Sequence, residues 1–139
     1  MRDLYHNVLP TQVLNPVVAT ATQTSSAIDL QGFNSASVVF AIGTAGDTLS
    51  GSIYWTLKLQ HCDDNSTYVD VAAADVNEAV TSIVVNSLSL DETAYNIGYI
   101  GSKRYVKGIA TATGTHTNGT PLGIVALRGT AAYRPVVTP

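Results

Sequence analysis

The sequence predicts a single all-β domain, an antiparallel β-sandwich or barrel of jelly-roll-like type. The chain has 139 residues, which suits one domain and allows a core to form without metal or disulfide staples. β-branched residues and an alternation of apolar and polar side chains recur along the chain, whereas the 3.6-residue helical period is nearly absent. Turn-forming residues separate these runs at short, regular intervals. Many short strands at such spacing indicate a sandwich or barrel rather than alternating βα units.

The clearest strand covers residues 52–61 and is followed by a hairpin turn. Its apolar residues alternate with polar ones, so that one face of the strand packs in the core and the other faces solvent. The apolar face carries Ile53, Trp55, Leu57 and Leu59. Residues 63–66, Asp-Asp-Asn-Ser, then supply turn chemistry, and residues 67–71 form the returning strand. This pattern places Trp55 in the core.

Further strands are expected on both sides of this hairpin. They are residues 27–30, 37–42, 82–85, 95–100, 104–112 and 122–127. The one candidate helical turn is short and covers residues 72–76. The loop at 113–120 contains Asn118-Gly119, a pair suited to a tight hairpin turn. We expect this loop to project from the domain, with His116 as a candidate contact to a neighbour.

Two terminal segments depart from the strand pattern. Residues 1–16 contain Pro10 and Pro16 with apolar residues between them, and residues 134–139 form a similar tail. We expect an N-terminal arm and a C-terminal tail on either side of a domain at 17–133, both lying on a neighbouring subunit. The predicted interface residues are Leu4, Tyr5, Val8, Leu9, Val13, Leu14, Arg134, Val136 and Val137.

Charge is sparse along the whole chain. Seven Lys and Arg oppose ten Asp and Glu, charged residues make up 12% of the chain, and the formal net charge is −3. Nucleic acid is therefore not an expected direct partner, because phosphate binding needs clustered basic residues. Neither a secretory leader nor an apolar run of membrane-spanning length is evident, so we expect a soluble protein made in the cytoplasm. Burial in an assembly, including a homo-oligomer, explains the low charge economically.

The sequence does not predict catalysis, a cofactor or a metal site. The three histidines are scattered, and no known motif spacing links a nucleophile, a base and an orienting group. One cysteine, Cys62, excludes an internal disulfide and is expected to be a buried small side chain. The carboxylates at 63–64 favour a turn over a calcium site, since the Asp-x-Asp-x-Asp-Gly frame is missing. Lys103-Arg104 is interpreted as a solvated strand end or an inter-subunit salt bridge.

Three segments together resemble a known group of proteins. They are residues 59–71, residues 97–106, and the Gly-rich hairpin with the final strand running into Tyr133-Arg134-Pro135. In this combination the chain resembles small virion structural proteins of tailed phages and prophages, over roughly residues 28–135. The resemblance implies a decoration or cement protein that binds the major capsid protein on the surface of the virion head. No functional residues are defined for that group.

Two alternatives to capsid decoration stay open at this point. A head–tail connector or tail component is the first, because the Asp-Asp-Asn-Ser-Thr-Tyr hairpin recurs in such proteins. A carbohydrate-binding sandwich module is the second, and only Trp55 could anchor its aromatic platform. The position of Trp55 on an apolar strand face argues against that platform.

Overall fold

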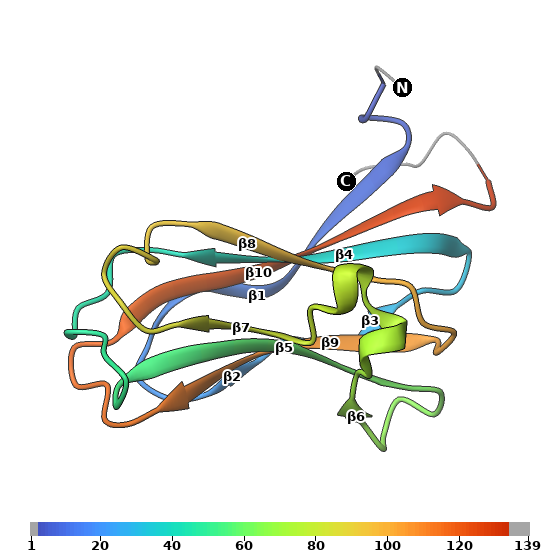
Figure 1. The fold of residues 1–139 in the computed structure, drawn as a ribbon. Helices are drawn as coiled ribbons and strands as arrows, with labels where there is room; N and C mark the ends of the chain where they lie inside the picture. Colours follow the sequence, from blue (N-terminus) through green and yellow to red (C-terminus); the bar gives the residue numbers. More distant parts are fainter. Residues whose placement is uncertain (1–2, 134–139) are drawn as a thin grey trace.

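A computed structural model describes residues 3–133 as two antiparallel β-sheets packed face to face (Figure 1). Sheet A has the strand order β1 (Val8–Ala19), β10 (Thr120–Ala131), β4 (Phe33–Ile42) and β8 (Ala94–Tyr99). Sheet B comprises β2 (Gln23–Thr24), β3 (Ile28–Asp29), β9 (Tyr105–Thr113), β5 (Tyr54–Cys62), β6 (Val69–Asp70) and β7 (Ser82–Val85). Two short 3₁₀ turns, η1 (Ala73–Asp75) and η2 (Asn77–Ala79), lie between β6 and β7. The predicted all-β sandwich is confirmed.

Sheet B is centred on β5, the strand that the sequence indicates most clearly. β5 pairs with β9 along its whole length, and on its other side with β7 and β6. Trp55, Leu57 and Leu59 are buried on one face, while the alternate residues are partly exposed. The solvent-exposed fraction of Trp55 is 0%, which confirms that it belongs to the core. Cys62 at the strand end is buried as expected.

Sheet A supplies the other half of the core through the same alternation. Phe40 on β4 lies opposite Ile124 on β10, and Val38 lies opposite Ile97 on β8. All four side chains are buried, and they pack with the apolar face of β5 in one continuous cluster. Because successive side chains of a strand point to opposite faces, the residues between them face outward.

The N-terminal segment differs from the expected separate arm. From Val8 onward it is β1, which pairs with β10 across two register shifts. Val13 is only 8% exposed and belongs to the core, and its carbonyl accepts the backbone N–H of Ser26. The prolines suggested an arm because they cannot donate to a ladder, but β1 is an edge strand. Pro10 and Pro16 are both exposed there, so a boundary at residue 16 would cut through a strand.

The loop between β9 and β10 also differs from expectation. The predicted hairpin is wrong, because β9 lies in sheet B and β10 in sheet A, so the loop connects two strands that do not pair. Gly119 in this loop has a positive φ of 77°. His116, however, is only 4% exposed and packs on the Trp55 ring, with 4.6 Å between the ring centroids. The loop therefore folds back onto the core, and His116 is not available as a contact to a neighbour.

Candidate functional site

The start of β1, the end of β10 and two loops lie at one end of the sandwich, which we call the terminal end (Figure 1). The loops are residues 30–32 between β3 and β4, and residues 100–104 between β8 and β9. Four large apolar side chains are well exposed on these segments. They are Leu4 (62% exposed), Tyr5 (67%), Ile100 (61%) and Tyr133 (91%). Leu4 and Tyr5 precede β1 and Ile100 follows β8, the two edge strands of sheet A, so these side chains span the width of the sheet. Large exposed apolar side chains at one end of a domain make that end a candidate interaction surface.

A local turn holds the first of these residues in place. The Leu4 carbonyl accepts the backbone N–H groups of Asn7 and Val8, at 3.1 and 3.0 Å. The Asp3 carboxylate accepts the His6 backbone N–H at 3.1 Å and contacts the His6 ring Nδ1 at 2.7 Å, and these contacts lower the pKa of Asp3. The turn directly precedes β1, so Leu4 and Tyr5 are carried on the edge of sheet A.

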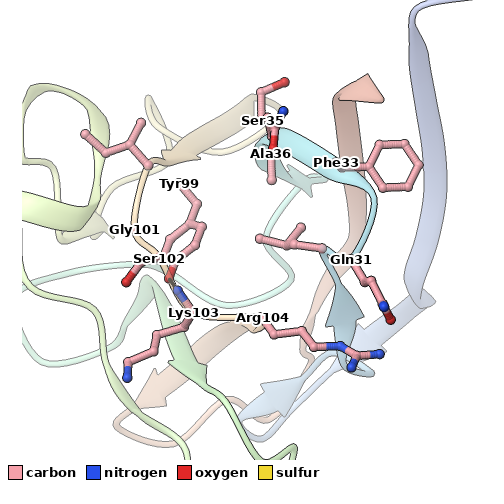
Figure 2. A pocket seen from close by; sticks show the side chains of 12 residues that line it. Gln31, Phe33, Ser35, Ala36, Tyr99, Gly101, Ser102, Lys103 and Arg104 are labelled. Carbon is pink, nitrogen blue, oxygen red and sulfur yellow. Dashed lines mark hydrogen bonds between the residues drawn. The ribbon is translucent and has the colours of Figure 1, made fainter. Parts of the chain in front are cut away.

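A cavity of about 380 Å³ opens at the same end, between the two loops (Figure 2). Its lining combines apolar, hydroxyl and amide side chains with two basic ones. The lining residues are Leu30, Gln31, Phe33, Asn34, Ser35, Ala36, Tyr99, Ile100, Gly101, Ser102, Lys103 and Arg104. The cavity depends on the β4–β8 pairing, which sets Ala36 opposite Tyr99.

Tyr99 is the residue that shapes the cavity wall. Its ring is buried, and its hydroxyl accepts the backbone N–H of Lys103 at 3.0 Å while bonding His61 Nδ1 at 2.9 Å. Burial raises the pKa of Tyr99. Because one side chain bonds both β5 and the loop after β8, the loop is fixed before any partner arrives.

The two basic residues at the rim are already paired inside the chain. Lys103 Nζ lies 2.6 Å from Asp63, and Arg104 donates two hydrogen bonds to Asp29 at 3.0 and 2.9 Å. Their side chains point to opposite sides of the cavity (Figure 2). The hydrogen bond from Arg104 lowers the pKa of Asp29, and the one to Asp63 raises the pKa of Lys103. Both side chains are partly exposed and their salt bridges lie within one chain, which fits the interpretation as a solvated strand end better than that as an inter-subunit bridge. The two cations at the cavity rim are thus already neutralised by carboxylates of the same chain.

The turn at 63–66 is stabilised by its own carboxylate. Asp64 accepts the backbone N–H groups of Ser66 and Thr67 at 3.0 and 2.9 Å, which holds its pKa far below the usual range. Asn65 has a positive φ of 56°, a conformation that Asn tolerates well. Within residues 3–133 no group of three His, Cys, Asp or Glu side chains is placed to hold a metal ion.

The predicted interface residues separate into three groups. Leu4 and Tyr5 are exposed at the terminal end. Val8, Leu9 and Leu14 are partly buried in β1, and Val13 is buried in the core. The remaining three, Arg134, Val136 and Val137, lie outside the described residues. Sequence reasoning missed the cavity and the exposure of Ile100. The one available signal was the alternation in β8, which buries Ile97 and Tyr99 on the same face.

The opposite end, which we call the hairpin end after the hairpin that Asn118-Gly119 predicted there, is closed by hydrogen bonds between its loops. It contains the 114–119 loop between β9 and β10. Trp55 Nε1 donates to the buried hydroxyl of Thr120 at 3.0 Å. The Asp47 carboxylate accepts backbone N–H groups of Asn118 and Gly119 at 3.0 and 2.9 Å, which lowers its pKa. This end buries Trp55 and bonds Asp47 across its loops, while the buried Nδ1 of His116 has no hydrogen-bond partner.

Comparison of the sequence with protein families and with curated proteins gives no match. Among solved structures, the fold is similar to that of the SPBc2 prophage-derived protein YomS, with a TM-score of 0.50. The sequence identity is 12%, and the match covers 88% of this chain and 92% of YomS. At this identity the likeness shows a shared fold. In the described part of the chain, no helix has the length and apolarity needed to cross a bilayer.

Proposed function

We propose that this protein is a structural component of a tailed-phage virion, and that it decorates the head by binding the lattice of major capsid protein. The observation that carries the proposal is the terminal end, where Ile100 is exposed in the lining of a preformed cavity and Leu4, Tyr5 and Tyr133 are exposed before β1 and after β10. Such a surface suits docking onto a protein, because apolar anchors and pockets dominate the energy of stable interfaces. The fold shared with a prophage-derived protein supports a phage origin.

The physical role of such a protein follows from mass action. A component that binds the assembled lattice but not its dissociated parts stabilises the lattice in proportion to its affinity. The ionic groups near the docking surface, Lys103 and Arg104, are paired within the chain. Binding therefore depends weakly on salt, because few charges are left for a partner and few ions are desolvated on contact.

A carbohydrate-binding role would need an exposed aromatic platform, and Trp55 was the candidate for it. Trp55 is buried between the sheets and hydrogen-bonded to Thr120, so it cannot form an exposed platform. A connector or tail role uses the same kind of surface but differs in copy number, since a ring at one vertex requires few copies and a lattice requires many.

The copy number in purified virions tests the proposal. Quantitative gel densitometry against the major capsid protein should give a fixed ratio that corresponds to a lattice-wide complement. A small number of copies per particle, as in a single ring, would replace decoration by the connector or tail role. Absence of the chain from virions would overturn the virion role itself.

A further inference from the structure

The outer faces of the two sheets differ in charge. The four strands of sheet A contain one charged residue, Arg128. Its guanidinium does not lie on the outer face, because it donates to the Asp29 carbonyl and to the Thr11 hydroxyl at 2.9 and 3.0 Å. The strands of sheet B, in contrast, carry Lys58, Asp70 and Lys107. The strands of sheet A thus present no charge on its outer face, although one carboxylate, that of Glu78 in η2, lies beside Asn96 at the β8 edge.

The strand register gives this face an ordered row of side chains. Gln12 lies opposite Val125, Val125 lies opposite Val39, and Val39 lies opposite Asn96. The residues that follow or precede them along the strands, Phe40, Ile124 and Ile97, are buried in the core, so the row points outward. The two valines are partly exposed, and the two amides are exposed. Across the sheet the row therefore reads amide, valine, valine, amide.

The amides at the two ends of the row keep hydrogen-bonding capacity. Gln12 Nε2 donates to Asn15 at 2.6 Å, and Asn96 Nδ2 donates to the Ser37 hydroxyl at 3.5 Å. Each side chain has two N–H donors and an oxygen that accepts two hydrogen bonds. One donor and the acceptor oxygen of each amide are thus left for a partner. The row combines an apolar centre with polar ends, as protein interfaces do.

We propose that the outer face of sheet A packs against the same face of a second copy, about a two-fold axis parallel to the strands. This rotation exchanges the two edges of the sheet, so Gln12 faces Asn96 of the second copy and Val125 faces its Val39. An isologous contact must be complementary to itself. The row meets that requirement, because amide meets amide, valine meets valine and no like charges are opposed.

The size of the face is adequate for a stable dimer. Four strands spaced about 4.8 Å apart and about ten residues long span roughly 600 Å² in projection. Standard interfaces bury about 800 Å² of accessible surface per partner, and side-chain relief makes accessible area larger than projected area. Sandwiched sheets pack in this way at about 10 Å separation. The terminal end stays free, so this contact is independent of the proposed docking on the head.

Light scattering during size-exclusion chromatography of the full chain tests the inference. The wild type should have twice the chain mass of 14.6 kDa. Gln12→Lys with Asn96→Lys opposes lysines at both ends of the row and should weaken the dimer at least about tenfold. Gln12→Lys with Asn96→Glu pairs opposite charges across the axis and should restore it. Thr111→Lys on the outer face of sheet B is the matched control, and it should leave the mass unchanged.

Each other outcome of this experiment counts against the inference. A wild type at the mass of one chain, or of three, would overturn the dimer. A double-lysine variant that keeps the wild-type mass would place the contact elsewhere. A Lys/Glu variant that stays dissociated would overturn the axis parallel to the strands, since a perpendicular axis opposes like residues. Circular dichroism melts of all variants check that folding is retained, because positions 12 and 96 are exposed.

Discussion

The two ends of the sandwich are built from loops of the same two sheets, yet they differ in how their side chains are buried and hydrogen-bonded. At the hairpin end, Trp55 is fully buried and bonded to Thr120, and Asp47 is bonded to the backbone of the facing loop. At the terminal end, Ile100 is exposed in the lining of a cavity, and Tyr5 is exposed just before β1. Bonding across the loops therefore sets the hairpin end apart, although Val18 (59%) and Leu88 (54%) are exposed there as well. The comparison teaches that the hydrogen-bonded burial of Trp55 and the surface proposed for docking lie at separate ends of this small domain.

The largest expected effect comes from the core of the hairpin end. Trp55→Ala should lower the free energy of unfolding by about 3 to 5 kcal/mol, because a large buried aromatic leaves a cavity when truncated. Urea denaturation of the purified protein measures this loss. A change under about 1 kcal/mol, which is usual for a surface position, would show that the hairpin end is not closed as described.

A smaller loss is expected when only the hydrogen bond is removed. Thr120→Val keeps the shape of the side chain but leaves the Trp55 Nε1–H buried without its acceptor. Such an unsatisfied donor costs about 1 to 3 kcal/mol. Urea denaturation provides the value, and Thr111→Val, on an outward position of β9, is the matched control. Equal effects at the two positions would contradict a specific role for the bond.

The Asp47 carboxylate makes the stability of the folded protein depend on pH. Its pKa is lowered in the folded state, so its contribution is fully present above the unfolded value of about 3.9 and is lost as pH falls through the folded value. Asp47→Asn should lower the melting temperature at neutral pH and reduce the further drop between pH 5 and acid pH. Parallel acid slopes for the variant and the wild type would contradict this linkage.

The smallest effect on stability is expected at the terminal end. Tyr5→Ser combined with Ile100→Ser removes exposed apolar area and should change the free energy of unfolding by less than about 0.5 kcal/mol per site. The reason is that neither side chain belongs to the core cluster. A loss comparable to that of Thr120→Val would mean that the terminal end contributes to the fold in the way the hairpin end does.

How far the sequence predicts this structure depends on how local each signal is. The strand with Trp55 is predictable because its alternation lies within one short run. β1 is not, because only the pairing with β10 shows that Pro10 and Pro16 lie at an edge. His116 is a loop residue whose burial depends on Trp55, which comes from a distant strand. The same non-local character hides the candidate site.

The cavity in particular has no signature in any one segment. Its walls are residues 30–36 and 99–104, which become neighbours only through the register of β4 and β8. Leu4 and Tyr5, by contrast, could be singled out as interface candidates because a short apolar stretch precedes Pro10, and both are exposed. Sequence reasoning thus found exposed side chains near the terminus but not the cavity at the same end of the sandwich.

The binding of the protein to heads that lack it tests the central claim most directly. Wild-type protein added to such heads should bind at a fixed stoichiometry and raise their resistance to heat. The Tyr5→Ser/Ile100→Ser variant should keep the wild-type melting temperature and lose both effects, whereas Thr120→Val, assayed below its own melting temperature, should keep both. Binding of the terminal-end variant at the wild-type stoichiometry would contradict the account.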